Sequence, residues 1–420
     1  MHQMNMGLAI IGVVVIAVAL LSGLIKRSPV SEPVLAVLAG LAVGPYGLDW
    51  LDLARWGDKN VILEQAAHLT AAVGLMSVAL RIQRQSIRPL LRPVTLLLTA
   101  GMLGMWLICS ALAGWLLGLP LWTALLLGAI GTPTDPVVSS SIVSGPFADK
   151  NLPLRLRDGL SLESGANDGL AYLLVMLPVL MLQHAPDQAW SQWLFEALLI
   201  GVVGACVIGL AIGFVAAHAL RFALHRRLVA QPSLLGFTIA LSLFTLGAAK
   251  LLHADAIISV FLAGLTFNLM TDARESARAE NIQEMAAKLL MLPMFVIFGV
   301  ALPLADWGRL GWPLLALAVL VLLLRRPPVV TALRPLWRGW FNREDSRFLG
   351  WFGPIGVAAM YYAAMARNHV HDPLLWQAAS ALIFTSILAH GISASPLTRL
   401  YARHPRPAPP HTAALRDDVE

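Results

Sequence analysis

Two short polar stretches stand inside long apolar sequence, where ionisable side chains need a reason to be. The first is Gly131-Thr132-Pro133-Thr134-Asp135-Pro136. Pro133 and Pro136 remove two backbone donors and oppose helical continuation, so neighbouring backbone groups lose their partners. A broken helix persists at membrane depth only where it faces protein or a water-filled cavity. Its half-helix ends, together with Asp135, would bind an ion. The alternative is a kink in which Asp135 only caps the second half-helix.

The second stretch runs from Ser161 to Gly169 and is followed by apolar sequence. Glu163 and Asn167 are four residues apart, and so are Ser164 and Asp168, so a helix places them in two adjacent polar stripes. Small residues at 164, 165, 166 and 169 permit close approach of a neighbouring helix. The alternative is a wet helix end at the membrane surface, although Asp168 lies about 15 Å deeper than Asp158 by helical rise.

Together the stretches predict an oxygen-ligand site built on the carboxylates of Asp135 and Asp168. The hydroxyls of Thr134 and Ser164, with freed backbone carbonyls, would complete the shell. Such ligands suit an alkali cation such as Na+, or a proton, rather than a soft metal. A buried carboxylate is more easily protonated than an exposed one. Protons and cations would therefore compete for one site, which is the chemistry of an exchanger.

These residues must be positioned by membrane helices. The 420-residue chain is 58% hydrophobic and 13% charged, with mean hydropathy +0.72. This composition excludes a soluble enzyme, a nucleic-acid binder and a disordered scaffold. Apolar stretches of spanning length predict an all-α integral membrane protein with thirteen transmembrane helices. They lie at 7–25, 33–49, 61–80, 93–117, 120–146, 159–182, 194–220, 232–250, 255–270, 285–304, 310–326, 348–366 and 373–394.

The basic residues predict the orientation of these helices. The connections between spans are numbered from the N-terminus and sorted alternately into two sets. One set holds 25 of the 30 Lys and Arg residues, and the other holds five. Because cytoplasmic loops are rich in Lys and Arg, the N-terminus should be periplasmic and the C-terminus cytoplasmic. The basic residues then serve topology and lipid contact, and no nucleic acid is expected. The first span is interpreted as a retained helix, residues 1–402 as the transmembrane domain, and 403–420 as a short disordered cytoplasmic tail.

A second helix break is predicted in the twelfth span, at Gly353 and Pro354. With the break in the fifth span it suggests two inverted six-helix repeats, about 7–182 and 232–394. Two unrelated kinks are the alternative. Arg325 or Arg326 would neutralise Glu163, with Arg326 favoured because it abuts Pro327. An ordinary cytoplasmic anchor is the alternative for this pair. Three further residues, Glu64, His68 and His390, are interpreted as isolated structural polar residues.

Thr134-Asp135-Pro136 followed by Glu163-Ser164-x-x-Asn167-Asp168 resembles the sodium/proton exchangers of the monovalent cation/proton antiporter superfamily, the NhaP-like group. The resemblance implies a homodimer in which a core domain moves across the membrane. It implies that Asp168 binds cation and proton alternately, assisted by Asp135, Thr134 and Ser164. Asn167 and Glu163 would hold the helices, Glu163 with an arginine. The Asn-Asp pair implies electroneutral exchange, and no cofactor is implied.

The sequence departs from that family at two places. Ser77 stands where many relatives carry a carboxylate, and Pro354-Ile355 separate the glycines of the twelfth span. We expect exchange of Na+ or Li+, with K+ a further candidate, for protons by alternating access in a bacterial inner membrane. An inverted-repeat symporter of an organic solute is the alternative. A membrane sensor or membrane-embedded enzyme is not favoured, because the sequence has no output domain and no nucleophile–base pair.

Overall fold

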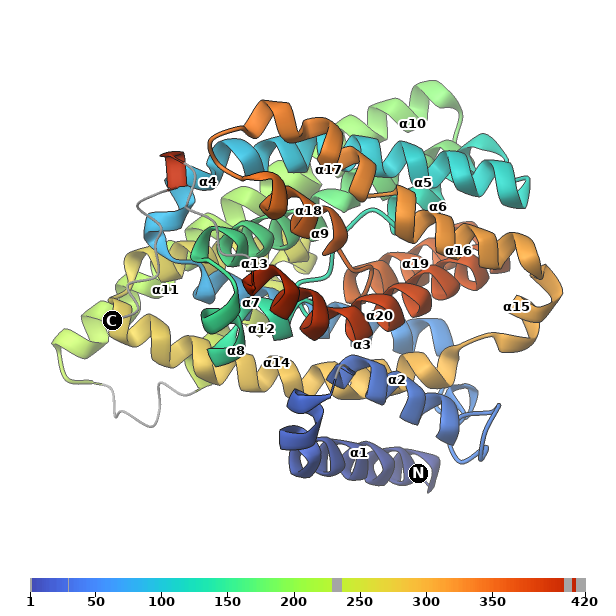
Figure 1. Cartoon of the computed structure of the whole chain (residues 1–420), viewed down its shortest axis with the longest axis horizontal. Coiled ribbons are helices and arrows are strands. Elements are labelled where there is room, and N and C mark those ends of the chain that lie inside the picture. Colours follow the sequence, from blue (N-terminus) through green and yellow to red (C-terminus); the bar gives the residue numbers. More distant parts are fainter. Residues whose placement is uncertain (1, 29, 229–235, 404–409, 413–420) are drawn as a thin grey trace.

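The computed structural model describes residues 2–28, 30–228, 236–403 and 410–412, and these residues form helices and connecting loops without a strand (Figure 1). The prediction of an all-α protein is thereby confirmed. The expected disordered tail falls almost entirely on 404–409 and 413–420, which lie outside the described residues.

The α-helices, in chain order, are α1 His2–Arg27, α2 Glu32–Val43, α3 Lys59–Arg81, α4 Arg84–Leu96, α5 Met102–Leu117, α6 Leu121–Ile130, α7 Ser140–Val143, α8 Gly145–Asn151, α9 Leu154–Gln183, α10 Pro186–Gln192, α11 Ala205–His225, α12 Phe237–Leu251, α13 Ala256–Met270, α14 Ala273–Ala301, α15 Leu304–Leu310, α16 Trp312–Leu324, α17 Pro327–Leu333, α18 Arg343–Trp351, α19 Val357–Val370 and α20 Pro373–Ala402. Two π-helical segments, Leu97–Gly101 and Trp193–Gly204, join α4 to α5 and α10 to α11.

Each of the thirteen expected spans overlaps one or more of these helices. The second expected span, 33–49, is wrong at its end. Helix α2 stops at Val43, because Gly44 is extended (φ −78°, ψ −173°) and the chain then folds back, with Leu48 N–H donating to the carbonyl of Ala42. Within the described residues seven helical stretches are long and apolar enough to cross a membrane, and five more apolar helices are shorter. The count of thirteen crossings therefore stays a prediction.

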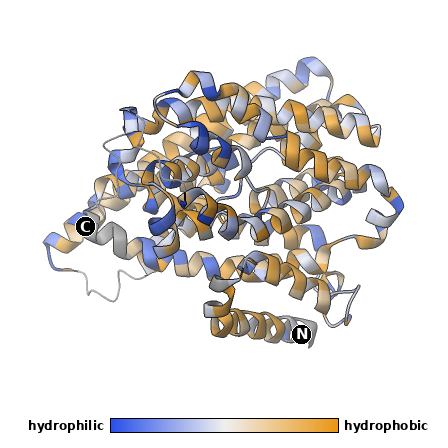
Figure 2. Ribbon diagram, viewed as in Figure 1, coloured by the Kyte–Doolittle hydropathy of each residue, from blue (hydrophilic) through white to orange (hydrophobic). Residues whose placement is uncertain are grey.

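The apolar residues that the chain cannot bury lie on the outer faces of peripheral helices. Helix α1 lies at the edge of the molecule beside α2 and α14 (Figure 1). Its Leu8 and Leu20 are 64% and 80% exposed, and apolar residues line most of its length (Figure 2). Surfaces of this kind are stable in lipid rather than in water. The chain is a multi-pass membrane protein.

The helices pack as two groups. The first group, here called the panel, comprises α2, α3, α11, α12, α13 and α14; the second, the core bundle, comprises α4, α5, α6, α9, α16, α18, α19 and α20. They meet where α3 packs on α19 and α9, and where α13 packs on α9.

Glycines on α9 allow the panel to approach the core bundle closely. A Cβ at Gly165 would overlap the ring of Phe261, and one at Gly169 would overlap Ile258, both on α13. The expected close approach of a neighbouring helix to this small-residue face is therefore confirmed. It brings α13 to the level of Asp168.

Candidate ion-binding site

Two helix breaks meet near the centre of the core bundle. Helix α6 ends at Ile130 and α7 begins only at Ser140, while α18 ends at Trp351 and α19 begins at Val357. The predicted breakers Pro133 and Pro136 lie in the first gap, and Gly353 and Pro354 in the second. The gaps touch, because the Asp135 N–H donates to the Pro354 carbonyl at 2.7 Å. Where the two breaks meet, backbone N–H and carbonyl groups lie in the interior without helical partners and need other hydrogen-bond partners.

Asp135 satisfies the amide ends of both breaks. Its Oδ1 accepts from the N–H groups of Val137 (2.6 Å) and Val138 (3.4 Å), and its Oδ2 accepts from Val357 N–H at the start of α19. A Cβ at Gly356 would overlap this carboxylate, so the approach requires glycine. The negative charge stands at the positive end of α19. Asp135 therefore caps amides of both breaks.

Arg325 satisfies the carbonyl ends of the same two breaks. Its Nη1 donates to the carbonyls of Gly131, Thr132 (3.1 Å) and Pro133 (3.3 Å), and its Nη2 donates to that of Gly353. The guanidinium thus lies where α6 and α18 present their negative ends. Arg325 was predicted to be a partner for Glu163 or a cytoplasmic anchor, and this role was not predicted. The signal was present, since carbonyls freed by prolines need a group with several donors.

The choice between the two arginines is settled by a buried ion pair. Arg326 donates through Nη1 and Nη2 to the two carboxylate oxygens of Glu163, at 2.6 and 2.7 Å. The side chains are 2% and 0% exposed. Arg326 Nε also donates to the Leu349 carbonyl at 2.7 Å. The pair joins α9 to the segment after α16, and the alternative of a cytoplasmic anchor is wrong for both arginines.

Asn167 links this ion pair to the first break. Its Nδ2 donates to Thr134 Oγ1 (2.6 Å) and to Glu163 Oε1 (3.1 Å), and its Oδ1 accepts from Thr134 N–H (3.1 Å). Ser164, on the adjacent stripe of α9, donates its hydroxyl proton to the Leu160 carbonyl at 2.6 Å. The Ser164 oxygen keeps its lone pairs as acceptors. Thr134 and Asn167 hold each other, whereas Ser164 can still accept a ligand.

Asp168 differs from the other acidic residues of the site. It is 2% exposed, and its Oδ1 has no hydrogen-bond partner among the described residues. Its backbone carbonyl accepts from the Tyr362 hydroxyl at 2.7 Å, a contact that the sequence did not predict. A buried carboxylate oxygen without a donor favours a proton or a cation as its partner.

A cavity approaches the site from the end of α3 that carries Arg81. It has a volume of about 760 Å³, and its lining includes Arg81, Arg84, Asp158, Asn268, Glu280 and Glu284. A small pocket of about 20 Å³ continues between α3, α14 and the first break, where Ser77 faces Pro136 and Val137. Arg81 and Glu284 line both spaces. Ser77, the residue that departs from the family pattern, therefore borders the approach to the first break.

The three residues predicted to be isolated behave differently from one another. His390 is a structural polar residue, as predicted, but it is not isolated: its Nε2 lies 2.9 Å from the Trp351 carbonyl, and its Nδ1 lies 3.2 Å from Ser386 Oγ. Glu64 accepts from Asn368 Nδ2 at 2.7 Å. His68, by contrast, has no hydrogen-bond partner on either ring nitrogen among the described residues.

Similar proteins place this geometry in a family. The family model for the sodium/hydrogen exchanger, transmembrane, matches residues 13–400. The chain is 31% identical over 396 residues to Na(+)/H(+) antiporter 2 of Zygosaccharomyces rouxii, covering 87% of this chain and 49% of that protein. It is 24% identical to the K(+)/H(+) antiporter NhaP of Alkalimonas amylolytica, covering 95% of this chain and 67% of that one. The chain thus spans about half the length of the yeast relative.

The fold has a solved counterpart. The sodium proton antiporter MjNhaP1 from Methanocaldococcus jannaschii superposes with a TM-score of 0.73 at 19% sequence identity, covering 96% of this chain and 99% of that one. At that identity the likeness establishes the fold. The resemblance seen in Thr134-Asp135-Pro136 and Asn167-Asp168 is confirmed by the family match. The chain belongs to the sodium/hydrogen exchanger family.

Proposed function

We propose that the chain exchanges Na+ for protons, and that Asp168 carries either one or the other. The observation that carries the proposal is the contrast among the buried carboxylates. Both oxygens of Asp135 accept backbone N–H groups and both oxygens of Glu163 accept from Arg326, whereas Asp168 Oδ1 has no donor among the described residues. Asp168 is therefore the carboxylate of the site whose charge is left for a transported ion.

The proposed exchange step balances charge at one carboxylate. A protonated Asp168 loses its proton to the cavity, and Na+ takes the vacated oxygen, with Ser164 Oγ and the Thr134 main chain as further ligands. The reverse occurs on the other side of the membrane. Burying a charged, empty carboxylate during the crossing is costly, so Asp168 crosses only as the acid or as the cation pair. This restriction couples the two flows.

The open side of the structure supports an inward-facing state. The cavity of about 760 Å³ lies at the ends of α3, α9 and α14 that carry the basic loops. Those loops are predicted to be cytoplasmic by the positive-inside rule. We therefore assign the structure to an inward-facing state, with the N-terminus periplasmic and the C-terminus cytoplasmic. The proposed location is a bacterial inner membrane.

Several finer properties belong to the proposal. The two breaks support an inverted-repeat architecture for about 7–182 and 232–394. The Asn167–Asp168 pair supports electroneutral one-for-one exchange, since one carboxylate can give up one proton for one Na+. Li+ and K+ are further candidate cations, and K+ is named in the relative from Alkalimonas amylolytica. We also propose a homodimer, no resident cofactor and no enzyme activity, in keeping with the antiporter names of the relatives.

The alternative, symport of an organic solute, is not favoured. The space next to the first break is about 20 Å³, which suits one small ion or water rather than an organic molecule. The basic side chains that line this space are Arg81, which donates to Ser161 Oγ at 3.2 Å, and Lys288, which pairs with Glu284 at 2.9 Å. The carboxylates of Asp135 and Asp168 also disfavour an anionic solute at the site.

The test is cation-induced collapse of a pH gradient in proteoliposomes, with Na+, Li+ and K+ added separately and the membrane voltage clamped. Collapse with at least one cation supports antiport and identifies the ion. The absence of a response to all three between about pH 6 and 9 would overturn the proposal. Repeating the assay at different clamped voltages tests electroneutrality, because a voltage-independent rate is expected.

A further inference from the structure

His68 is a buried histidine, without a hydrogen bond to any described residue, at the meeting of the panel and the core bundle. Its side chain lies on α3 and the residue is 3% exposed. Its ring stacks on Tyr361 of α19, with centroids 4.3 Å apart and planes inclined by 18°. Neither Nδ1 nor Nε2 has a partner among the described residues. An unpaired buried polar group is unfavourable, so burying His68 against Tyr361 destabilises this conformation.

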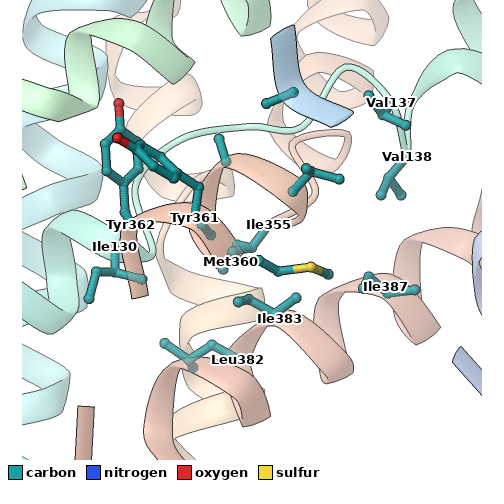
Figure 3. Packing of buried hydrophobic residues seen from close by; sticks show 14 of the residues in the cluster. Ile130, Val137, Val138, Ile355, Met360, Tyr361, Tyr362, Leu382, Ile383 and Ile387 are labelled. Atoms are coloured by element: carbon teal, nitrogen blue, oxygen red, sulfur yellow. The ribbon is translucent and has the colours of Figure 1, made fainter. Parts of the chain in front are cut away.

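The stack lies between the candidate site and the surface opposite the large cavity. Figure 3 shows Tyr361 and Tyr362 side by side, with ring centroids 5.1 Å apart. The Tyr362 hydroxyl binds the Asp168 carbonyl, which places the stack next to the site. Beyond it, toward the beginning of α3, Asn368 donates to Glu64. The contact between α3 and α19 therefore closes the site on the side away from Arg81.

We propose that His68 is the gating residue of this closed side, and that it biases the protein toward opening there. The proposal rests on the proposed function, because opening on this side is the second half of alternating access. When α19 moves away from α3, the Tyr361 ring leaves His68 and both ring nitrogens meet water. In the open state both ring nitrogens can form hydrogen bonds with water, which they cannot form in the closed state. Each unpaired ring nitrogen raises the ratio of open to closed protein by about 5- to 150-fold.

His390 provides a matched control within the same chain. It is 4% exposed, close to the value for His68, but both of its nitrogens have partners. An apolar replacement at His390 removes favourable contacts, whereas one at His68 removes only the penalty of the closed state. The two substitutions should therefore have opposite effects on the stability of this conformation.

The experiment measures opening without using transport. Cys109 and Cys206, the two cysteines of the chain, are replaced by Ala. Ala71→Cys is then introduced as a probe, because Ala71 is 3% exposed and lies one helical turn from His68 on the same side of α3. The rate of maleimide labelling of this thiol in purified protein reports how often the closed side opens. Ser77→Cys is the matching probe beside the small pocket.

We expect His68→Phe, which retains an aromatic ring for stacking, to slow labelling at position 71 by at least about fivefold. Labelling at position 77 should not slow, and the melting temperature should rise. His68→Leu should act in the same direction, and His390→Phe should lower the melting temperature without slowing labelling at position 71. Unchanged or faster labelling at position 71 in both His68 variants, or equal slowing by His390→Phe, would overturn the proposal. Because labelling needs no transported cation, failure of the antiport assay would be seen separately.

Discussion

Asp135 and Asp168 have the same chemistry and equal burial, at 2% exposure, but opposite hydrogen bonding. Both Asp135 oxygens are occupied by backbone amides of the two broken helices. Asp168 Oδ1 has no donor among the described residues. The first carboxylate is committed to holding the breaks together, and the second is available for an exchangeable partner. Burial does not distinguish the two carboxylates, but the neighbouring N–H groups do.

The same contrast separates the two arginines. Arg325 takes the carbonyl ends of both breaks, as Asp135 takes their amide ends. Arg326 neutralises Glu163. The contact between the two breaks is thus stabilised by one negative and one positive side chain. The charge of Glu163 is neutralised separately by Arg326. This arrangement leaves Asp168 Oδ1 with neither an ion-pair nor a hydrogen-bond partner among the described residues.

The largest effect is expected from Asp168→Asn, which removes the exchangeable charge and changes little else. Cation-induced collapse of a pH gradient should fall by at least about 100-fold, because neither a proton nor a cation can then be carried as proposed. Expression and the size-exclusion profile should remain those of the unaltered protein. Exchange at the original rate in this variant would refute the assignment of Asp168.

The next effect is on stability, from Glu163→Gln. It leaves Arg326 buried without its counter-charge and should lower the free energy of unfolding by about 3–5 kcal/mol. Denaturation in mixed micelles measures this loss, and adding Arg326→Met should recover part of it. Asp306→Asn is the control, since its pair with Arg309 is exposed and contributes at most about 1 kcal/mol. Equal losses in the two single variants would show that the buried Glu163–Arg326 pair contributes no more to the free energy of unfolding than the Asp306–Arg309 pair.

Asp135→Asn should have a smaller effect on transport than Asp168→Asn. The Asn amide places an NH2 group against a backbone N–H, so one cap is lost at a cost of about 1–3 kcal/mol. We expect exchange to slow by about tenfold but to persist in the proteoliposome assay. Complete loss of exchange in a stably folded Asp135→Asn protein would mean that both carboxylates bind the transported ion.

The smallest expected difference concerns pH. Proton and cation compete for Asp168, so lowering the pH fills the site with protons and raises the apparent KM for Na+, approaching tenfold per pH unit on the acidic side. Asp135→Asn should leave this slope unchanged, because Asp135 is not the competing group. A shallower slope in that variant, measured from initial rates at several Na+ concentrations, would count against the separation of roles.

The sequence predicted the parts of the site better than their connections. Prolines at 133, 136 and 354 located both breaks, and the spacing of Glu163, Asn167 and Asp168 placed them on one helix. The partner of Glu163 was predicted from charge balance, with Arg326 favoured, but contacts between side chains and backbone carbonyls of distant segments were not predicted. Tyr362 reaches Asp168 from α19, and Arg325 reaches Gly131 from the end of α16. The same limit explains His390, whose partner Trp351 lies 39 residues away.

The central claim is that Asp168 alone exchanges a proton for a cation. It is tested most directly by measuring proton release when Na+ or Li+ is added to purified, weakly buffered protein. We expect about one proton per chain from the unaltered protein and from Asp135→Asn, and none from Asp168→Asn. Proton release that survives in Asp168→Asn, or disappears in a folded Asp135→Asn protein, would contradict the account.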